Sequence, residues 1–312
     1  MSPEHFVTLF DRRFLPQGLA LHESLRRWAP DARLWVVCMD APTETALRRL
    51  ALDGVVLIPL RELETPALLA VKGGRTTGEY CWTLTPFVFP AVFDRDPSVS
   101  RVTYLDADLF FFADPKVLLE ELDRSEKSVL VTEHAYDPVY DVSARFGRFC
   151  VQFLTFDRTE PARRILDRWR SQCLEWCYGR EDSPGRFGDQ MYLDEWPGRF
   201  GEFVHVLKRT DATLAPWNVK YFSRRGRLVP VFYHFHGFRI LSRGRALLYS
   251  WFRIGKEGRR FYDVYLEALR RKIADMERVG AALEPIPLPT HWGTVVFRWI
   301  NRLRGKIEFS RL

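Results

Sequence analysis

Residues 101–115 read RVTYLDADLFFFADP, and two acidic residues, Asp106 and Asp108, interrupt a stretch that is otherwise almost wholly apolar. The residues on either side are of the types that form strands in a sheet buried on both faces. Because an ionised acid is costly to bury without a partner, we expect the pair at the end of a strand, facing a positive charge. A divalent metal ion is the simplest candidate for that charge.

Strand and helix patterns alternate on both sides of this stretch. We predict strands at residues 5–10, 32–40, 54–60, 101–112, 128–134, 150–157 and 226–239, the last running into a loop with two histidines. We predict helices at residues 16–30, 42–52, 85–96, 115–124 and 160–177. This alternation is typical of an α/β fold with a single, mostly parallel Rossmann-like sheet and helices on both faces.

The composition indicates a globular protein with a large core, since 46% of the 312 residues are hydrophobic. We expect a main domain over residues 1–240 and a basic, helical C-terminal extension over residues 241–312. The formal net charge of +7 suits an anionic substrate or an anionic lipid surface. Nucleic acid is not expected as a partner, because the basic residues are dispersed and no binding module is recognisable.

Cysteine and hydropathy patterns favour the cytoplasm. The five cysteines include no C-x-x-C pair, which argues against a disulfide framework and a structural zinc site. The N-terminus lacks the apolar core of a signal peptide, and no later run is long enough to span a membrane. We therefore expect a cytoplasmic protein with reduced, buried thiols.

The spacing of the two aspartates suits a metal site. Residues two apart project from the same side of an extended backbone, so both carboxylates can reach one hard cation such as Mn²⁺ or Mg²⁺. The run FYHFHGF at residues 232–238 delivers His234 and His236 from another strand, and neutral imidazole can complete such a site. Two alternatives stay open: a D-x-D triplet also occurs in solvated turns, and either histidine can be a core residue.

Four motifs occur in a particular order along the chain: VTLF at 7–10, YLDADLFFFADP at 104–115, GDQMYLDEW at 188–196 and HFHG at 234–237. This order resembles nucleotide-sugar glycosyltransferases of the glycogenin and bacterial lipopolysaccharide galactosyltransferase type, over about residues 5–239. The runs CVQFLTF, EWCYGR, GDQMYLDEWP and APWN give a closer resemblance to bacterial glycosyltransferase-like proteins of undetermined substrate.

The resemblance implies a GT-A-type fold in which residues 1–240 form a nucleotide-sugar-binding catalytic domain. Asp106, Asp108 and His234 are implied to hold Mn²⁺ or Mg²⁺ against the diphosphate of the donor, with a UDP-sugar as the preferred donor. The implied reaction is a hexosyl transfer with retention of the anomeric configuration.

The remaining donor contacts are also implied by the resemblance. Thr8, Phe10 and Asp11 match the positions that bind the base and ribose. Asp189 and Gln190 match the pair beside the sugar and the reacting centre.

Two positions depart from the family pattern. Cys150 stands where the family's F-N-x-G motif has asparagine, so contacts to the acceptor are not carried over. The family's phosphate-binding lysine after H-x-x-G is missing, and Arg239 is the residue that we expect in its place. Trp82 and Trp217, each beside polar residues, are candidates for stacking on a sugar face.

The acceptor implied by the resemblance is a saccharide or a lipid-linked saccharide, in the synthesis of cell-surface polysaccharide or lipopolysaccharide. Residues 291–312 alternate aromatic and basic residues, which is compatible with a helix lying on an anionic membrane at its inner face or docked on the protein. Two other functions stay open: an aspartate-nucleophile phosphatase, although Leu109 occupies the position where that motif has Thr or Val, and an inactive sugar-nucleotide-binding partner.

Overall fold

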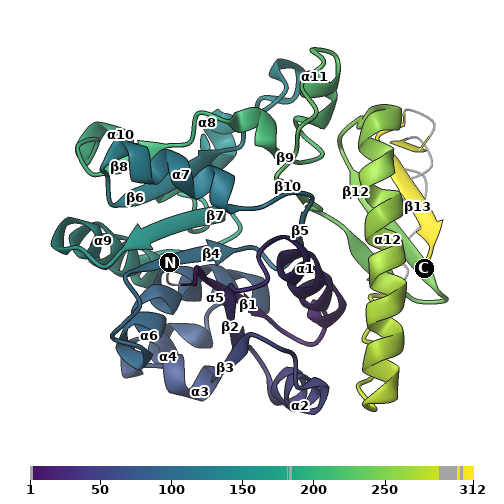
Figure 1. Ribbon diagram of the computed structural model, residues 1–312, viewed down its shortest axis with the longest axis horizontal. Coiled ribbons are helices and arrows are strands. Elements are labelled where there is room, and N and C mark those ends of the chain that lie inside the picture. Colours follow the sequence, from purple (N-terminus) through teal and green to yellow (C-terminus); the bar gives the residue numbers. More distant parts are fainter. Residues whose placement is uncertain (1–2, 181, 183–184, 288–300, 303–304) are drawn as a thin grey trace.

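The apolar strand patterns assemble into a seven-stranded central sheet in the computed structural model (Figure 1). The structure describes residues 3–180, 182, 185–287, 301–302 and 305–312. The strands run in the order β3-β2-β1-β4-β7-β6-β8, where β1 is His5–Phe10, β2 Arg33–Cys38, β3 Val55–Pro59, β4 Arg101–Leu105, β6 Val129–Glu133, β7 Phe149–Asp157 and β8 Val204–Val206. Only the β4–β7 and β6–β7 pairs are antiparallel. The predicted α/β class with a mostly parallel sheet is confirmed.

Helices cover both faces of this sheet because the strands are apolar on both sides. In β1, Phe6 and Phe10 pack with one group of helices, whereas Val7 and Leu9 pack with the other. The first group is α1 (Leu15–Trp28), α2 (Ala41–Leu50) and α7 (Lys116–Ser125). The second group is α4 (Pro66–Lys72), α5 (Thr77–Leu84), α6 (Val88–Arg95) and α9 (Glu160–Glu175). The shorter helices are α3 (Leu60–Leu63), α8 (Ser143–Phe146), α10 (Trp196–Arg199) and α11 (Val219–Ser223), with 3₁₀ turns η1 (Thr85–Phe87), η2 (Pro138–Tyr140), η3 (Met191–Glu195) and η4 (Thr210–Ala212).

The stretch predicted as one strand over residues 101–112 is two strands. β4 ends at Leu105, and β5 (Leu109–Phe111) leaves the central sheet to pair antiparallel with β10 (Phe232–His234). β10 also pairs parallel with β9 (Thr213–Leu214), which makes a separate three-stranded sheet. The two aspartates lie in the link between the sheets, where the Leu109 amide donates to the Asp106 carbonyl at 3.1 Å.

The C-terminal part combines a long helix with a third small sheet. α12 (Gly255–Arg278) is the helix that the sequence predicts there, and it lies along α1 (Figure 1). β11 (Arg239–Leu241), β12 (Arg245–Ser250) and β13 (Ile307–Arg311) form an antiparallel sheet that was not predicted. The proposed division at residue 240 falls inside β11 and stays a prediction.

The expected amphipathic helix over residues 291–312 is wrong at its described end. There, β13 pairs with β12. Residues 307–311 are therefore part of a sheet and are docked on the protein. Residues 291–300 and 303–304 of the expected helix lie outside the described residues. Among the described helices, none is both long and apolar enough to cross a membrane.

Candidate active site

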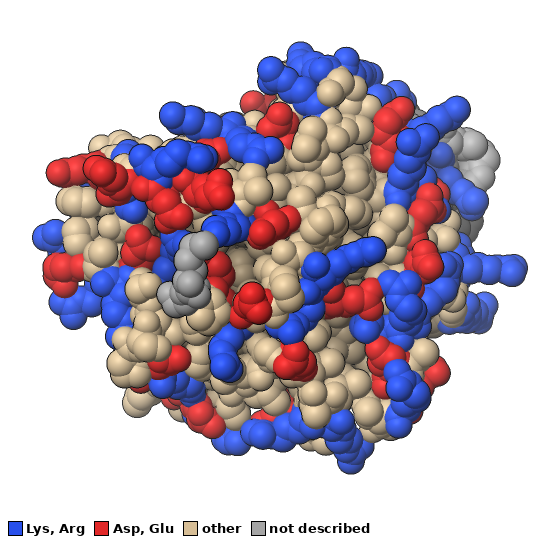
Figure 2. All heavy atoms as spheres, in the orientation of Figure 1, with Lys and Arg blue, Asp and Glu red and all other residues tan. Residues whose placement is uncertain are grey.

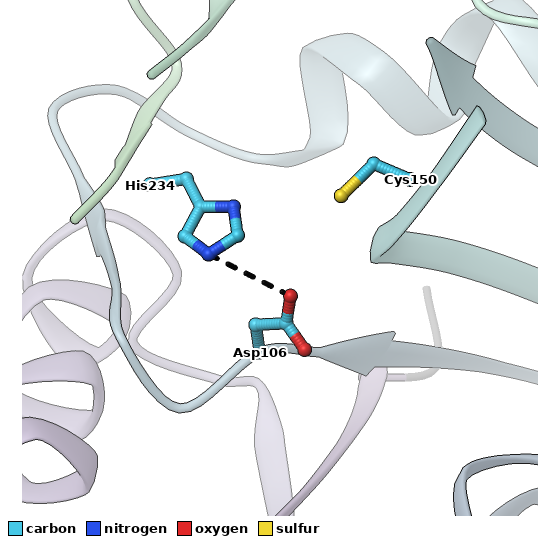
Figure 3. Close-up of side chains that lie close together, drawn as sticks. All are labelled: Asp106, Cys150 and His234. Atoms are coloured by element: carbon cyan, nitrogen blue, oxygen red, sulfur yellow. Dashed lines mark ion pairs between the residues drawn. The ribbon is translucent and has the colours of Figure 1, made fainter. Parts of the chain in front are cut away.

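The link between β4 and β5 brings two carboxylates to the histidine at the end of β10. His234 is paired with Leu109 in the register of β5 and β10, directly after Asp108 in the chain. Its Nε2 lies 3.1 Å from Asp108 Oδ1 and 3.7 Å from Asp106 Oδ2 (Figure 3). Asp108 and His234 are buried, whereas Asp106 is half-buried. The structure therefore brings together the three residues that the sequence pointed to as metal ligands.

Hydrogen bonds orient the imidazole of His234. Its Nδ1 lies 2.7 Å from Gln152 Oε1, so Nδ1 carries a hydrogen and Nε2 faces the carboxylates. Burial alone lowers the pKa of His234, but the adjacent Asp108 carboxylate outweighs burial and raises it well above the ordinary value. Without a metal ion, Nε2 is therefore protonated and donates to Asp108.

The two carboxylates have different pKa values. Burial raises the pKa of Asp106 to about 6, and the neighbouring His234 only partly opposes this, while the Tyr104 hydroxyl donates to Asp106 Oδ1 at 3.0 Å. For Asp108, burial also raises the pKa, but the charge and hydrogen bond of His234 dominate and lower it to about 2. Asp108 is thus the permanently ionised member of the pair.

These residues fit a divalent metal ion. Two carboxylates and one imidazole Nε2 are the oxygen and nitrogen donors that Mn²⁺ accepts, and Gln152 fixes the ring as metal-site partners commonly do. Metal binding replaces the proton on Nε2, because a ligating histidine is neutral. Within the described residues, His234 is the cationic side chain that forms ion pairs with Asp106 and Asp108.

His236 occupies a different position from His234. It is exposed, and its ring centroid lies 5.5 Å from that of His234 and 5.4 Å from that of Trp217. In the described part of the chain, its side chain forms no hydrogen bond or ion pair with either aspartate. The geometry thus supports His234 rather than His236 as the third ligand.

Two further residues of the centre were missed from the sequence. Gln152 and Cys150 lie at the start of β7, which runs antiparallel to β4, and the Asp106 amide donates to the Gln152 carbonyl at 3.1 Å. One ligand atom from each of Asp106, Cys150 and His234 lies within 4.8 Å of the other two. The departure from the F-N-x-G motif marked this segment, but only the strand register places it beside the aspartates.

Asp189 is buried and lies near enough to this centre for the charge of Asp106 to act on it. Its side chain is 3% exposed, and among the described residues its Oδ2 has no hydrogen-bond partner. Burial, followed by the charge of Asp106, raises the pKa of Asp189 to about 7, although a hydrogen bond with Thr85 opposes the shift. Its neighbour Gln190 is half-buried and donates through Nε2 to the Phe146 carbonyl.

The predicted nucleoside-binding residues lie at the end of β1 and in the turn after it. Thr8 is fully buried, and its hydroxyl has no hydrogen-bond partner within the described chain. Phe10 is buried, with its ring so close to Gly18 that a Cβ there would lie 2.4 Å away. Asp11 accepts from the Arg13 and Phe14 amides at 3.0 and 3.3 Å, which fixes the turn into α1.

Arg239 reaches from β11 toward the same turn. Its guanidinium lies over the ring of Phe14, 5.4 Å from the centroid, and its positive charge contributes to the lowered pKa of Asp108. A cation therefore lies close to the turn after β1 and near enough to Asp108 to affect its pKa.

The two candidate stacking residues, Trp217 and Trp82, differ in how far their rings are exposed to a ligand. Trp217 is 4% exposed and donates to the His134 carbonyl at 2.7 Å, so its ring is a packing element beside His234. Trp82 is half-buried, and a Cβ built on Gly188, next to Asp189, would meet its ring at 3.6 Å. Trp82 therefore lies beside the backbone next to Asp189 and keeps part of its surface exposed.

Two proteins of Bacillus subtilis (strain 168) are similar to this chain along most of its length. YfnD is 32% identical over 292 residues, which are 89% of this chain and 92% of YfnD. YfnF is 31% identical over 253 residues, which are 76% of this chain and 82% of YfnF. No protein-family model matches the chain.

Solved structures of glycosyltransferases share the fold. The galactosyltransferase LgtC superposes with a TM-score of 0.53 at 13% identity, covering 93% of this chain and 99% of its own. Mouse xyloside xylosyltransferase 1 gives 0.51 at 16% identity, covering 75% and 98%, and GlyE of Streptococcus pneumoniae TIGR4 gives 0.51 at 16%, covering 89% and 64%. The chain therefore belongs to the family of YfnD and YfnF and has the GT-A fold of nucleotide-sugar glycosyltransferases, as the resemblance in its sequence implied.

Proposed function

We propose that the protein is a metal-dependent glycosyltransferase that moves a hexose from a UDP-sugar to a saccharide or lipid-linked acceptor, in the synthesis of cell-surface polysaccharide or lipopolysaccharide. The observation that carries the proposal is the convergence of Asp106, Asp108 and His234 at the end of β4, in a GT-A fold. Bound there, Mn²⁺ or Mg²⁺ would offset the negative charge that grows on the departing nucleoside diphosphate.

In this proposal, different residues of the chain bind different parts of the nucleotide-sugar donor. Arg239 supplies a fixed positive charge to the phosphates. The end of β1 and its turn, with Thr8, Phe10 and Asp11, binds the base and ribose. The unpaired Asp189 Oδ2 accepts a hydrogen bond from a sugar hydroxyl, since a buried polar atom without a partner gains most from a ligand that supplies one. Gln190 lies beside it, at the reacting centre.

The test measures nucleoside diphosphate released by the purified protein from UDP-, GDP- and dTDP-sugars, with and without Mn²⁺. We expect metal-dependent release from a UDP-sugar, faster when an acceptor saccharide is present. Tight donor binding without any turnover would support the inactive-partner alternative. Release of inorganic phosphate from simple phosphate esters would support the phosphatase alternative. NMR of the product anomer tests the proposed retention.

Contact with the inner face of an anionic membrane is a second part of the proposal. Residues 220–229, here called the basic segment, carry Lys220, Arg224, Arg225 and Arg227, and no ion pair of these four is found in the described part of the chain. Figure 2 shows the basic side chains gathered over α11 at the top of the view. Beside them Val229 is 62% exposed, so the segment offers cations and an apolar tip together.

The basic segment follows Trp217, whose ring packs against the candidate ligand His234, so a membrane bound there would lie near the candidate metal centre. Each cation near an anionic bilayer contributes roughly 1 kcal/mol, and salt screens this attraction. We place the enzyme in the cytoplasm on this proposal, and its five free cysteines agree with that compartment.

Co-sedimentation with phosphatidylglycerol and phosphatidylcholine vesicles tests the membrane contact. The double variant R225E/R227E should lose more than about tenfold in affinity for the anionic vesicles. R27E/R164E changes the net charge equally at two exposed arginines on α1 and α9, and it should bind like the wild type. Equal loss in both variants would show a general charge effect instead.

A further inference from the structure

Cys150 offers the metal centre a ligand of a different kind. Its side chain is 3% exposed at the start of β7, and its sulfur lies within 4.8 Å of a carboxylate oxygen of Asp106 and a ring nitrogen of His234. Figure 3 shows the Cys150 sulfur turned toward the imidazole ring, with the Asp106 carboxylate below the two. Burial raises the pKa of the Cys150 thiol, while its hydrogen bond with His234 opposes that shift.

Thiolate, imidazole and carboxylate together form a ligand set that Zn²⁺ and Co²⁺ accept in tetrahedral geometry. Tetrahedral Zn–S and Zn–N bonds place the two ligand atoms about 3.5 Å apart. His234 Nε2 and Asp106 Oδ2 are 3.7 Å apart, and the Cys150 sulfur lies within 4.8 Å of a ligand atom of each residue, so small movements would bring the three to such spacings. Mn²⁺ and Mg²⁺ prefer oxygen donors and gain little from the thiolate.

We propose that the centre has a second, thiolate-bearing ligand set, made of Asp106, His234 and Cys150, that binds Zn²⁺ and thereby inhibits the enzyme. It shares two ligands with the set of Asp106, Asp108 and His234, so the two metal positions exclude one another. On binding, the Cys150 thiol gives its proton to solvent and His234 loses the proton on Nε2.

Inhibition follows from coordination number. A tetrahedral ion with three protein ligands keeps one open position, whereas a diphosphate that chelates a metal needs two. The inhibitory role rests on the proposed function, but the ligand set does not, and the experiment separates the two.

Co²⁺ absorption spectroscopy tests the ligand set directly. A Co²⁺–thiolate bond gives a near-ultraviolet charge-transfer band, which we expect in the wild type and in C38S but not in C150S. Cys38 is also buried, in β2, and is the matched control for loss of a buried thiol. C150A is measured in parallel with circular dichroism, so that a folded variant without the sulfur is at hand if C150S does not fold.

Competition between metals tests the consequence. C150S should bind Zn²⁺ at least about tenfold more weakly than the wild type and Mn²⁺ within about threefold of it. The zinc concentration that halves Mn²⁺-dependent release of nucleoside diphosphate should rise in proportion. A charge-transfer band that persists in C150S and C150A, or unchanged Zn²⁺ affinity, would overturn the proposal. A band in a protein that shows no turnover with any donor would instead refute the proposed function and leave the ligand set standing.

Discussion

Asp108 and Asp189 are both buried carboxylates near one centre, yet their surroundings shift their pKa values in opposite directions. Asp108 faces His234 at 3.1 Å, and its pKa is lowered to about 2. Asp189 has an Oδ2 without a partner among the described residues, and burial raises its pKa to about 7. Environments that separate the pKa values of two like groups commonly assign them different roles. We propose that the Asp108 side of the site, here called the metal side, holds a cation, and that the Asp189 side, here called the sugar side, holds a sugar hydroxyl.

Asp108→Asn should have the largest effect, because it removes the ionised ligand and leaves the size of the side chain unchanged. We expect a loss of roughly 100-fold or more in Mn²⁺ affinity, about 3 kcal/mol, measured by calorimetry in the presence of UDP. Asp31→Asn changes an exposed aspartate on the loop before β2 and should bind like the wild type. If Asp108→Asn bound Mn²⁺ and UDP as tightly as the wild type, Asp108 would not be a metal ligand.

His234→Ala should come next. It removes the neutral donor and also the partner that lowers the pKa of Asp108, so Mn²⁺ affinity should fall about tenfold or more. His236→Ala removes an exposed ring that only contacts other rings, and the fall should stay within about threefold. A larger loss in His236→Ala than in His234→Ala would reverse the ligand assignment.

The parts of the fold that the sequence predicted are those governed by local patterns. The strand expected at 5–10 is β1, His5–Phe10, because its apolar residues alternate between two buried faces. The expectation that Asp106 and Asp108 lie at the end of a strand is confirmed, but the departure of the following residues into another sheet was not predicted. β5 pairs with β10 more than 100 residues away, and no local pattern reports such a partner.

The same reason explains what was missed in the site and at the C-terminus. Gln152 and Cys150 reach the aspartates only through the antiparallel register of β7 and β4. The apolar and polar residues of 307–311 alternate in a way that suits a strand as well as a helix. Pairing with β12 stabilises the strand. Residue types were enough to identify the carboxylates and His234. Gln152 and Cys150, which lie beside them, could be found only from the pairing of the strands.

Asp189→Asn tests whether the Asp189 carboxyl keeps its proton in the folded protein. The readout is the pH dependence of the free energy of unfolding. In the unfolded chain this carboxyl loses its proton near its ordinary pKa of 3.8, whereas in the folded protein it keeps the proton up to about 7. The raised pKa therefore costs the wild type stability as the pH rises between these values, and nothing further above them. Relative to the wild type, the variant should gain up to about 4 kcal/mol across this window.

Urea unfolding of both proteins in chelator, at several pH values, measures this difference, and groups common to both proteins cancel. Mn²⁺ should shrink the difference, because a cation at Asp106 offsets the charge that helps to raise the pKa of Asp189. A difference that did not change with pH would mean that Asp189 is ionised throughout and is not the neutral member of the pair.

Trp82 should give the smallest effect, and it tests whether the sugar side also uses an aromatic face. The ring is half-buried and lies against the backbone at Gly179 and Gly188, next to Asp189. A stacked ring contributes about 1 kcal/mol, so Trp82→Leu should raise the KM for the nucleotide sugar by roughly threefold to tenfold. Because only the sugar would touch the ring, the affinity for UDP should not change.

Trp82→Phe restores an aromatic face and should recover most of the lost affinity, which simple loss of packing volume would not explain. Trp28→Leu serves as the control, since Trp28 is 40% exposed at the end of α1 and contacts no predicted site residue in the described structure. If Trp82→Leu weakened UDP and UDP-sugar equally, the ring would act by supporting the Gly188–Asp189 backbone. The sugar side would then rest on Asp189 and Gln190, without an aromatic platform.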